Sequence, residues 1–176
     1  TTDIAVISLC RPVVDASTKV AGDKFDEAII RYIRRKHNVL IGEQTAEELK
    51  INIGCAYPRE DELTMEVRGR NIISGMPAIL TISSTEMLEA LEEPVSSIFE
   101  AVHSVLEQTP PELMADLSQR GIVMTGGGSL LYGLDRMLAT RVGIEVIVAE
   151  DPVSCVAVGT GIALNIMDRF ADIAGL

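Results

Sequence analysis

The sequence contains no tryptophan, and phenylalanine and tyrosine contribute only three residues each. So few aromatic rings provide no stacking platform for nucleobases. Basic residues are scarce as well: 15 Lys and Arg stand against 26 Asp and Glu, which gives a net charge of −11 at pH 7. A surface of that sign repels phosphate backbones and anionic lipids. The composition therefore argues against nucleic acid as a partner and against electrostatic binding to membranes.

Residues that bind metals or form disulfides are also few. The chain has three cysteines and two histidines, and it has no Cys-x-x-Cys pair. This set predicts neither a zinc site nor a disulfide framework, and it favours a reduced, cytoplasmic setting. We expect Cys55 and Cys155 to be small buried residues, because no histidine lies near either one in sequence. No Ser-His-Asp or paired-carboxylate pattern indicates a catalytic centre.

Long apolar runs are missing too. No stretch reaches the roughly 18 apolar residues of a transmembrane helix, and the first residues do not have the pattern of a signal peptide. The sequence opens on threonine instead of methionine, so we expect an upstream segment to be missing. Aliphatic residues are abundant, and 47% of the 176 residues are hydrophobic. That is enough for the core of one ordinary domain or two small lobes.

The last third of the chain has the most regular pattern. Residues 121–125 and 144–149 have the composition of strands, and helical stretches follow them at residues 129–138 and 153–167. Such alternation favours an α/β layer on a mainly parallel sheet. We expect residues 4–9 to add a buried strand.

The acidic middle of the chain lacks this alternation. An apolar stripe predicts a helix over residues 24–36, and a capping box at Thr45–Glu48 predicts a second, short helix. Alternating residues 63–67 and 78–83 predict an antiparallel pair. We therefore expect a smaller lobe inserted at residues 23–92.

Two further capping boxes predict helix starts. Ser83–Glu86 begins a helix that we expect Pro94 to interrupt. Thr109–Glu112 begins another, with proline at its first position. The glycines of Gly159-Thr160-Gly161 are expected to allow close helix packing.

The strongest local indication of a binding site is the turn Thr125-Gly126-Gly127-Gly128-Ser129, between a strand and a helix. Glycines let a ligand approach the backbone, and amides at a helix start can bind phosphate or ribose. The turn matches neither the P-loop nor the G-x-G-x-x-G pattern. On these residues alone, a tight structural turn explains it equally well.

The first residues, Thr1-Thr2-Asp3, place hydroxyls beside a carboxylate, which could contact a phosphate or hold Mg²⁺ through water. A disordered terminus is the better explanation of these residues by themselves.

Six stretches together resemble the MreB family, the bacterial homologues of actin, and the similarity covers essentially the whole chain. They are residues 21–30, 41–47, 65–70, 109–113, 120–128 and 148–152. The resemblance implies the α/β, actin-like ATPase (RNase H-like) fold, in which two domains close on ATP and Mg²⁺. This chain would be the second domain, without the family's N-terminal domain. Its α/β nucleotide-binding subdomain would comprise residues 1–22 and 93–176, and a smaller α+β subdomain would be inserted at residues 23–92.

The resemblance also implies which residues contact the nucleotide. They are the end of a phosphate loop, a ribose-side turn, an adenine-side helix and the glycine turn: Thr1 and Thr2; Gly22 and Asp23; Ala46, Glu47, Glu48, Leu49 and Lys50; and Gly126, Gly127, Gly128 and Ser129. Asp3 matches a residue near the attacking water and is a weak catalytic candidate, and no metal-ligating side chain is implied. The intact family consists of ATPases. Because phosphoryl transfer needs groups from both sides of the cleft, we expect this half alone to be inactive.

The function implied is that of an ATP-binding cytoskeletal protein whose membrane-associated filaments direct cell-wall synthesis and rod shape. It would lie in the cytoplasm against the inner face of the membrane, which it would reach through the missing half. Its partners would be other filament subunits, a RodZ-like protein and cell-wall elongation proteins. An alternative is a non-catalytic interaction module of the same fold. Sugar kinases and heat-shock-type ATPases share the superfold, but residues 66–70 and 109–113 favour MreB.

Overall fold

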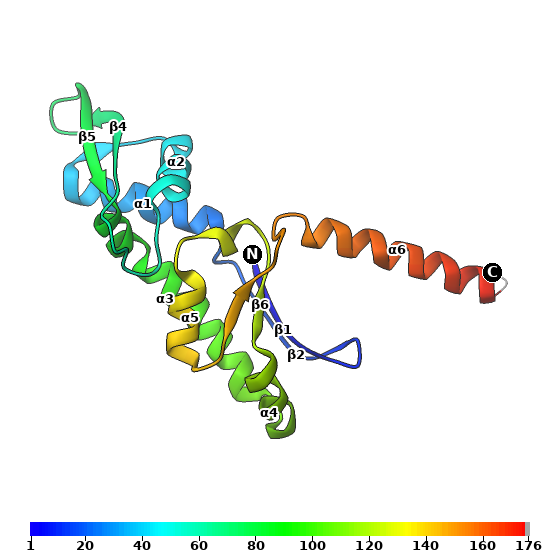
Figure 1. Ribbon diagram of the computed structural model, residues 1–176. Helices are drawn as coiled ribbons and strands as arrows, with labels where there is room; N and C mark the ends of the chain where they lie inside the picture. Colours follow the sequence, from blue (N-terminus) through cyan, green and yellow to red (C-terminus); the bar gives the residue numbers. More distant parts are fainter. Residues whose placement is uncertain (175–176) are drawn as a thin grey trace.

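The computed structural model describes the backbone of residues 1–174 and the side chains of residues 1–164. Its elements alternate between short sheets and helices (Figure 1). In chain order they are β1 (Thr2–Ser8), β2 (Arg11–Thr18), α1 (Gly22–His37), β3 (Val39–Leu40), α2 (Glu43–Ile53), β4 (Thr64–Asn71), β5 (Pro77–Ser83), α3 (Ser84–Gln108), α4 (Pro111–Arg120), β6 (Ile122–Met124), the 3₁₀ turn η1 (Gly127–Leu130), α5 (Leu134–Val142), β7 (Val146–Val148) and α6 (Cys155–Ala174).

The 25-residue helix α3 joins the two ends of the molecule. Figure 1 shows α1, α2 and β3–β5 beside its first half, and α4, α5, β6 and β7 beside its second half. The predicted capping box at its start is confirmed: the Ser83 hydroxyl accepts from the Glu86 N–H at 3.3 Å, and the Glu86 carboxylate accepts from the Ser83 N–H at 3.1 Å. The predicted interruption at Pro94 is wrong. The helix is continuous because Leu91, Pro94 and Val95 are packed in the core, which outweighs the lost backbone hydrogen bond.

The strands of the described residues form three small sheets. Strands β3, β4 and β5 form one antiparallel sheet, so the predicted pairing of residues 63–67 with 78–83 is confirmed. Strands β1 and β2 form an antiparallel hairpin, and β6 pairs in parallel with β7. The expectation of a mainly parallel sheet is therefore wrong, because β6 and β7 are the one parallel pair among the described strands.

Two predicted helix starts are displaced. Helix α2 begins at Glu43 with Gly42 as N-cap, so Thr45 lies inside the helix. Helix α4 has proline at its first position as expected, but the Thr109 hydroxyl donates to the Val105 carbonyl at 2.7 Å and caps nothing. In neither case is the threonine of the Thr-x-x-Glu pattern the N-cap; Gly42 and Pro110 take that position instead.

One hydrophobic core extends from α1, α2, α3 and the inner face of β4 and β5 to α5 and β7. The predicted apolar stripe of α1 is confirmed, since Phe25, Ile29 and Ile33 are at most 1% exposed. They pack with the equally buried Leu49 of α2 and Leu91 of α3. Full burial of one such side chain contributes about 1.5–3 kcal/mol to the free energy of unfolding, so these five residues together stabilise the packing of α1, α2 and α3 substantially. Helix α3 runs across the predicted boundary at residue 92, and the two-subdomain division stays a prediction.

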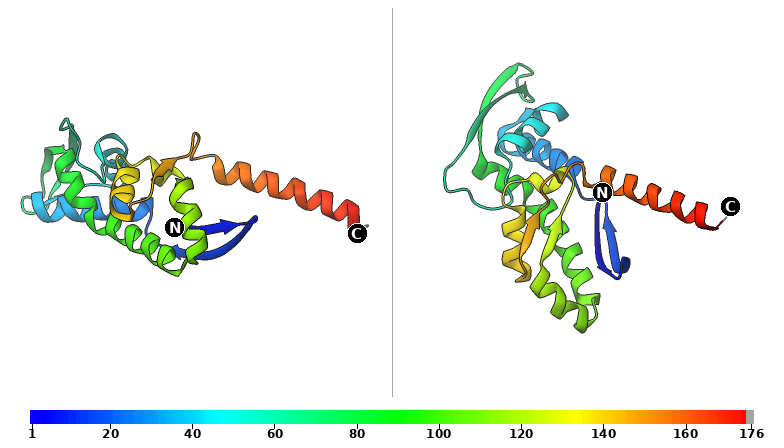
Figure 2. Two further views of the ribbon diagram at one scale, coloured as in Figure 1. Left: turned by 60° about the horizontal axis from the view of Figure 1, so that its bottom comes forward. Right: turned by 45° about the vertical axis from the view of Figure 1, so that its right-hand side comes forward.

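The hairpin β1–β2 and the helix α6 both project from this body in the three views of Figures 1 and 2. The expected burial of residues 4–9 is wrong, because Ile7 is 68% and Leu9 95% exposed. The expected close packing at Gly159 and Gly161 is also wrong: neither has a neighbour within 4 Å among the described residues, since this part of α6 lies away from the body. Within the described residues, no helix is long and apolar enough to cross a membrane.

The turn of the β1–β2 hairpin is strained, which generates a first prediction. Leu9 and Cys10 have φ of +50° and +61°, although neither is glycine. Left-handed backbone costs an ordinary residue about 1 kcal/mol or more, and two-residue hairpin turns of this type favour Asn-Gly. We expect the double substitution Leu9→Asn, Cys10→Gly to raise the free energy of unfolding by about 1–2 kcal/mol in urea denaturation. Cys10→Ser keeps the strain and should give no gain; equal stability of the double variant and wild type would contradict this account.

The second prediction concerns Glu86, whose side chain is 15% exposed. Besides the Ser83 N–H, its carboxylate bonds His37 Nε2 at 2.6 Å. Burial raises the pKa of Glu86, but the bonds from Ser83 and His37 outweigh burial and hold this pKa below the ordinary 4.5. The unfolded state then binds more protons, so the stabilisation is present at neutral pH and is lost as pH falls below about 4.5.

We therefore expect Glu86→Gln to lower the free energy of unfolding by about 1–2 kcal/mol at pH 7 and by much less at pH 3.5, as measured by urea denaturation. Glu93→Gln is the matched control on the same helix, because its ion pair with Arg31 is exposed. A pH-independent loss in Glu86→Gln would show that the ionised carboxylate is not responsible.

Candidate functional site

The predicted glycine turn is tied in place on both sides. Strand β6 ends at Met124, and the Gly126 N–H donates to the Pro152 carbonyl at 2.6 Å. The hydroxyl of Ser129 donates to the Gly126 carbonyl at 2.7 Å. The expected helix over residues 129–138 is wrong in detail: a 3₁₀ turn follows first, and α5 begins only at Leu134. Because Ser129 is 6% exposed and already bonded, it stabilises the turn and its side chain is not free for a ligand.

The backbone of Gly127 and Gly128, by contrast, is open. A Cβ at either position would meet no described atom within 4 Å. Their N–H groups donate to no other residue of the described chain, although the amides of Gly126 and Ser129 on either side are bonded. Two adjacent free amides at the end of a strand form a concave donor site that suits the oxygens of a phosphate or a ribose.

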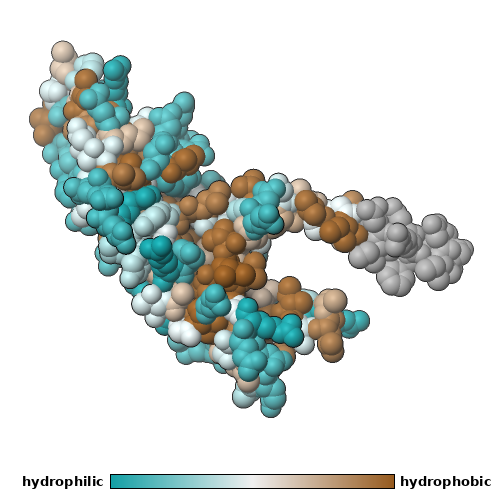
Figure 3. All heavy atoms as spheres, in the orientation of Figure 1, coloured by the Kyte–Doolittle hydropathy of each residue, from teal (hydrophilic) through white to brown (hydrophobic). Residues whose placement is uncertain are grey.

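A hollow of about 400 Å³ lies beside this turn and brings three predicted segments together. Figure 3 shows apolar surface gathered where the body of the molecule, α6 and the hairpin meet. The hollow's apolar lining, which includes Phe25, Val102 and Leu106, was not predicted. Its predicted members are Thr1, Thr2, Asp3, Gly22, Gly126, Gly127, Gly128 and Ser129.

The first residues of the chain, Thr1 and the start of β1, are held by side-chain hydrogen bonds. The Thr2 hydroxyl donates to the Val20 carbonyl at 2.7 Å. The Asp3 carboxylate accepts from the Ser17 hydroxyl at 2.5 Å and from the Thr1 hydroxyl at 3.4 Å. The exposed carboxylate of Asp3 is therefore held at the edge of the hollow, where it remains accessible to water or a cation.

The predicted adenine-side helix α2 divides into two faces. Ala46 and Leu49 are fully buried, so their side chains serve the core. Glu47 and Glu48 are exposed, and Lys50 is half-buried. These five residues do not line the hollow, and neither does Asp23 in the first turn of α1.

Lys50 nevertheless reaches the rim of the hollow. Its Nζ lies 2.8 Å from Asp26 Oδ2 and 3.5 Å from the carbonyl oxygen of Gly22. Asp26 was missed from the sequence. Its position one helical turn after Gly22 is the signal that could have identified it, because residues i and i+4 lie on one face of a helix.

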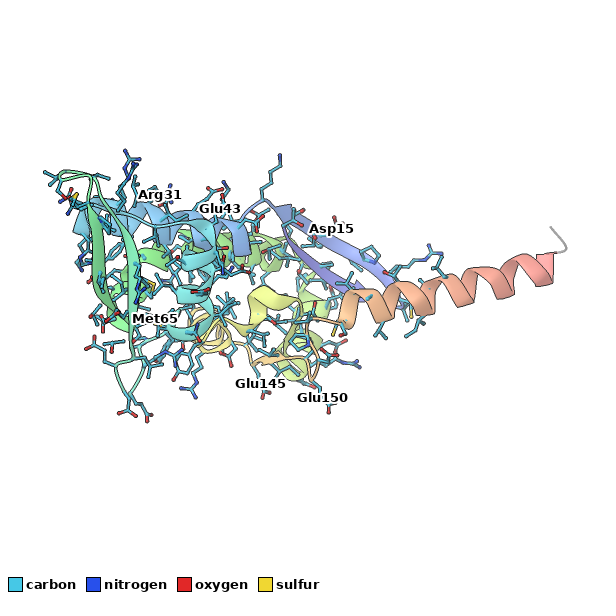
Figure 4. The ribbon with its side chains drawn as sticks, turned by 90° about the horizontal axis from the view of Figure 1, so that it is seen from above. Asp15, Arg31, Glu43, Met65, Glu145 and Glu150 are labelled. Atoms are coloured by element: carbon cyan, nitrogen blue, oxygen red, sulfur yellow. The ribbon has the colours of Figure 1, made fainter. Side chains whose placement is uncertain are left out.

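The end of α2 is fixed against the segment that follows the glycine turn. The Ala56 N–H donates to the Tyr132 carbonyl at 2.8 Å. A Cβ at Gly133 would lie 2.4 Å from the Cβ of Tyr57, so the two backbones are in close contact. Arg59 stacks over the Tyr132 ring at 3.8 Å. These contacts set the position of α2 relative to the glycine turn. Figure 4 shows the two regions that these contacts connect: Met65 marks the side of β4, and Glu145 and Glu150 mark the side of β7.

A reactive cysteine or a metal site would be another source of chemistry in the described residues. Cys55 is buried as predicted, its thiol donates to the Ser84 carbonyl at 3.2 Å, and burial raises the pKa of that thiol. Cys155 is half-buried, not buried as predicted, because it lies at the start of the projecting α6. In this part of the chain no three His, Cys, Asp or Glu side chains gather as a metal site.

Comparison with known proteins gives consistent matches over nearly the whole chain. The family model described as MreB/Mbl protein matches residues 1–172. Cell shape-determining protein MreB of Escherichia coli K12 is 54% identical over 168 residues, which are 96% of this chain and 48% of that protein. Cell shape-determining protein Mbl of Bacillus subtilis 168 is 50% identical over 169 residues, 96% of this chain and 51% of that protein. The chain thus spans about half the length of the curated relatives it matches.

Solved structures agree. MreB5 of Spiroplasma citri bound to AMPPNP has a TM-score of 0.94 at 38% identity, and the match covers 99% of this chain and 52% of that one. The same protein bound to ADP has a TM-score of 0.93, again at 38% identity, over 97% of this chain and 52% of that one. The MamK double helical filament, at 22% identity and a TM-score of 0.71 over 86% of this chain and 47% of that one, shares the fold alone. The predicted fold class, α/β of the actin-like ATPase type, is confirmed.

The contact at Gly133 generates a third prediction. Gly133 and Gly143 have φ of +74° and +70°, but a Cβ at Gly143 would meet nothing within 4 Å in the described structure. Gly143→Ala therefore measures the backbone strain alone, about 1 kcal/mol. We expect Gly133→Ala to cost at least about 2 kcal/mol more in urea denaturation, because it must separate Tyr57 from the start of α5. Equal losses in the two variants would contradict the close contact.

Proposed function

Because the chain belongs to the MreB/Mbl family of actin-like proteins, we propose that it is a nucleotide-binding part of an ATP-dependent cytoskeletal protein that determines cell shape. The observation that carries the proposal is the pair of free amides at Gly127 and Gly128, beside a hollow whose rim includes Thr1 and Gly22. The nucleotides bound to the related MreB5 structures, AMPPNP and ADP, support the choice of ligand.

Each group of the site would contact a different part of the nucleotide. The amides of Gly127 and Gly128 would donate to phosphate or ribose oxygens. Thr1 and Thr2 line the same hollow and would lie near further phosphate oxygens, with the Thr2 hydroxyl already donating to the Val20 carbonyl. Gly22 and Asp23 would lie near the ribose. The exposed side of α2, with Glu47, Glu48 and Lys50, would face the base, while Ala46 and Leu49 support it from the core.

Charge indicates that the ligand is the magnesium complex. The chain has a net charge of −11, and the Asp3 carboxylate lies at the rim of the hollow. A free nucleotide carries several negative charges and would be repelled. Mg²⁺ bridges phosphate oxygens and neutralises their charge. Asp3 would hold water near the outermost phosphate, and the remaining catalytic groups of the intact cleft would come from outside these residues.

We further propose that the whole protein assembles into filaments at the inner face of the cell membrane and directs cell-wall synthesis. Its family, whose relatives are named cell shape-determining proteins, supports this role. The MamK filament supports assembly as a capacity of the shared fold. Filament subunits, a RodZ-like protein and cell-wall elongation proteins would be its partners, with membrane contact outside this chain.

Titration with Mg-ATP, followed by thermal unfolding, tests nucleotide binding. A ligand at 100 times its dissociation constant adds about 2.7 kcal/mol to the stability of the native state, so we expect a saturable rise in Tm. In Gly127→Ala the new methyl group occupies the open donor site. The apparent affinity for Mg-ATP should therefore fall at least tenfold, and the rise in Tm at a given concentration should be smaller.

Gly159→Ala is the matched control, because its Cβ also meets no described atom within 4 Å but lies on α6, outside the residues that line the hollow. It should bind Mg-ATP like the wild type. A folded wild-type chain whose Tm does not respond to millimolar Mg-ATP would contradict the proposal, and so would an unchanged affinity in Gly127→Ala.

A further inference from the structure

Asp26 makes a largely buried ion pair that the functions assigned so far do not use. Its Oδ2 lies 2.8 Å from Lys50 Nζ, and both side chains are only 17% exposed. The pair connects α1 to α2. The second oxygen, Oδ1, is buried and has no hydrogen-bond partner in the described part of the chain.

This arrangement is a poor way to stabilise two helices. A buried ion pair loses hydration on both partners, and an apolar pair of the same size is often as stable or more so. The unpaired Oδ1 adds a further cost, because a buried acceptor without a donor is penalised. The neighbouring side chains of α1 and α2, among them Phe25, Ile29 and Leu49, are apolar and belong to one buried core, which already holds the two helices together. The pair is therefore better explained by where it holds the ammonium group.

The ammonium group lies at the rim of the hollow. It is 3.5 Å from the Gly22 carbonyl oxygen, and Gly22 lines the hollow together with the glycine turn. A lysine side chain free in solvent samples many rotamers, and Asp26 restricts Lys50 to this one place. Of the three N–H donors of Lys50, one is directed to Asp26 and one to Gly22, so one is left for a ligand.

We propose that Asp26 is a positioning residue for the nucleotide, which it influences through Lys50. Asp26 does not line the hollow, so it would not contact the ligand itself. Its carboxylate also neutralises the lysine, so Lys50 acts as an oriented hydrogen-bond donor and not as a free charge. Such a donor suits an uncharged polar group, a ribose hydroxyl or a base acceptor, and not the phosphates. This inference rests on the proposed function.

A double-mutant cycle on the full chain tests it, with the dissociation constants of Mg-ATP and Mg-ADP and that of AMP measured by calorimetry. Asp26→Asn keeps the shape of the side chain and removes its charge. We expect Asp26→Asn and Lys50→Met each to weaken binding about tenfold, the order expected for one charge-assisted hydrogen bond. The double variant should be no weaker than Lys50→Met alone, because Asp26 has nothing to position once Lys50 is absent.

The nucleotide series separates the nucleoside from the phosphates. If Lys50 donates to the nucleoside, Asp26→Asn weakens ATP, ADP and AMP by the same factor; a factor that grows with the number of phosphates overturns that assignment. Losses that multiply in the double variant, or a lower Tm with unchanged affinity, overturn the positioning role. If Asp26→Asn does not fold, Asp26→Glu provides the same test, because it keeps the charge and displaces the carboxylate by one methylene.

Glu27→Gln is the matched control. Glu27 is the next residue of α1, and its ion pair with Lys24 at 2.6 Å is exposed to solvent. It should leave all three affinities unchanged. A wild-type chain that binds no nucleotide would contradict the proposed function itself, whereas normal binding by both the wild type and Asp26→Asn contradicts only the role of Asp26.

Discussion

The close contact between the end of α2 and the segment after the glycine turn determines the geometry of the candidate site. One backbone hydrogen bond, from Ala56 to Tyr132, and the contact of Gly133 with Tyr57 join parts of the chain that are more than 70 residues apart in sequence. Helices α1 and α3 also connect α2 to this part of the molecule. With the two contacts in place, the lysine of α2 and the open amides of the turn keep a fixed separation, which a rigid ligand requires.

A second constraint comes from charge. An acidic chain that is to bind an anion must supply positive potential locally, yet no lysine or arginine lines the hollow among the described residues. The donors at Gly127 and Gly128 are backbone dipoles, and Lys50 is already paired with Asp26. Both are fixed before a ligand arrives, so little reorganisation is needed on binding. They also provide no net positive charge, so in the proposed complex neutralisation of the phosphates would be left to a cation bound with them.

The sequence predicted the features that depend on local pattern. The stripe of α1, the pairing of β4 with β5, the capping box of α3 and the glycine turn each follow from residues close together in the chain. The predictions from sequence were wrong where the structure depends on contacts between distant parts of the chain. Pro94 stays helical because neighbouring elements pack around it. The exposed hairpin formed by residues 4–9 and their pairing partner, Arg11–Thr18, was missed because that partner has too weak an alternation to be recognised as a strand. Asp26 was missed for the same reason, since its partner is 24 residues away.

The glycines show why a site can be located from sequence before its parts can be assigned. In the sequence, Gly126, Gly127 and Gly128 are equivalent, and the run as a whole indicates a binding turn. In the structure, Gly126 has a positive φ and donates to Pro152, so it shapes the turn. Gly127 and Gly128 have free amides and open space in place of a side chain, so they are the ones that can receive a ligand. Backbone conformation and unbonded amides distinguish the two roles. The partner of the Gly126 amide, Pro152, lies after β7, so no pattern within the turn itself reveals it.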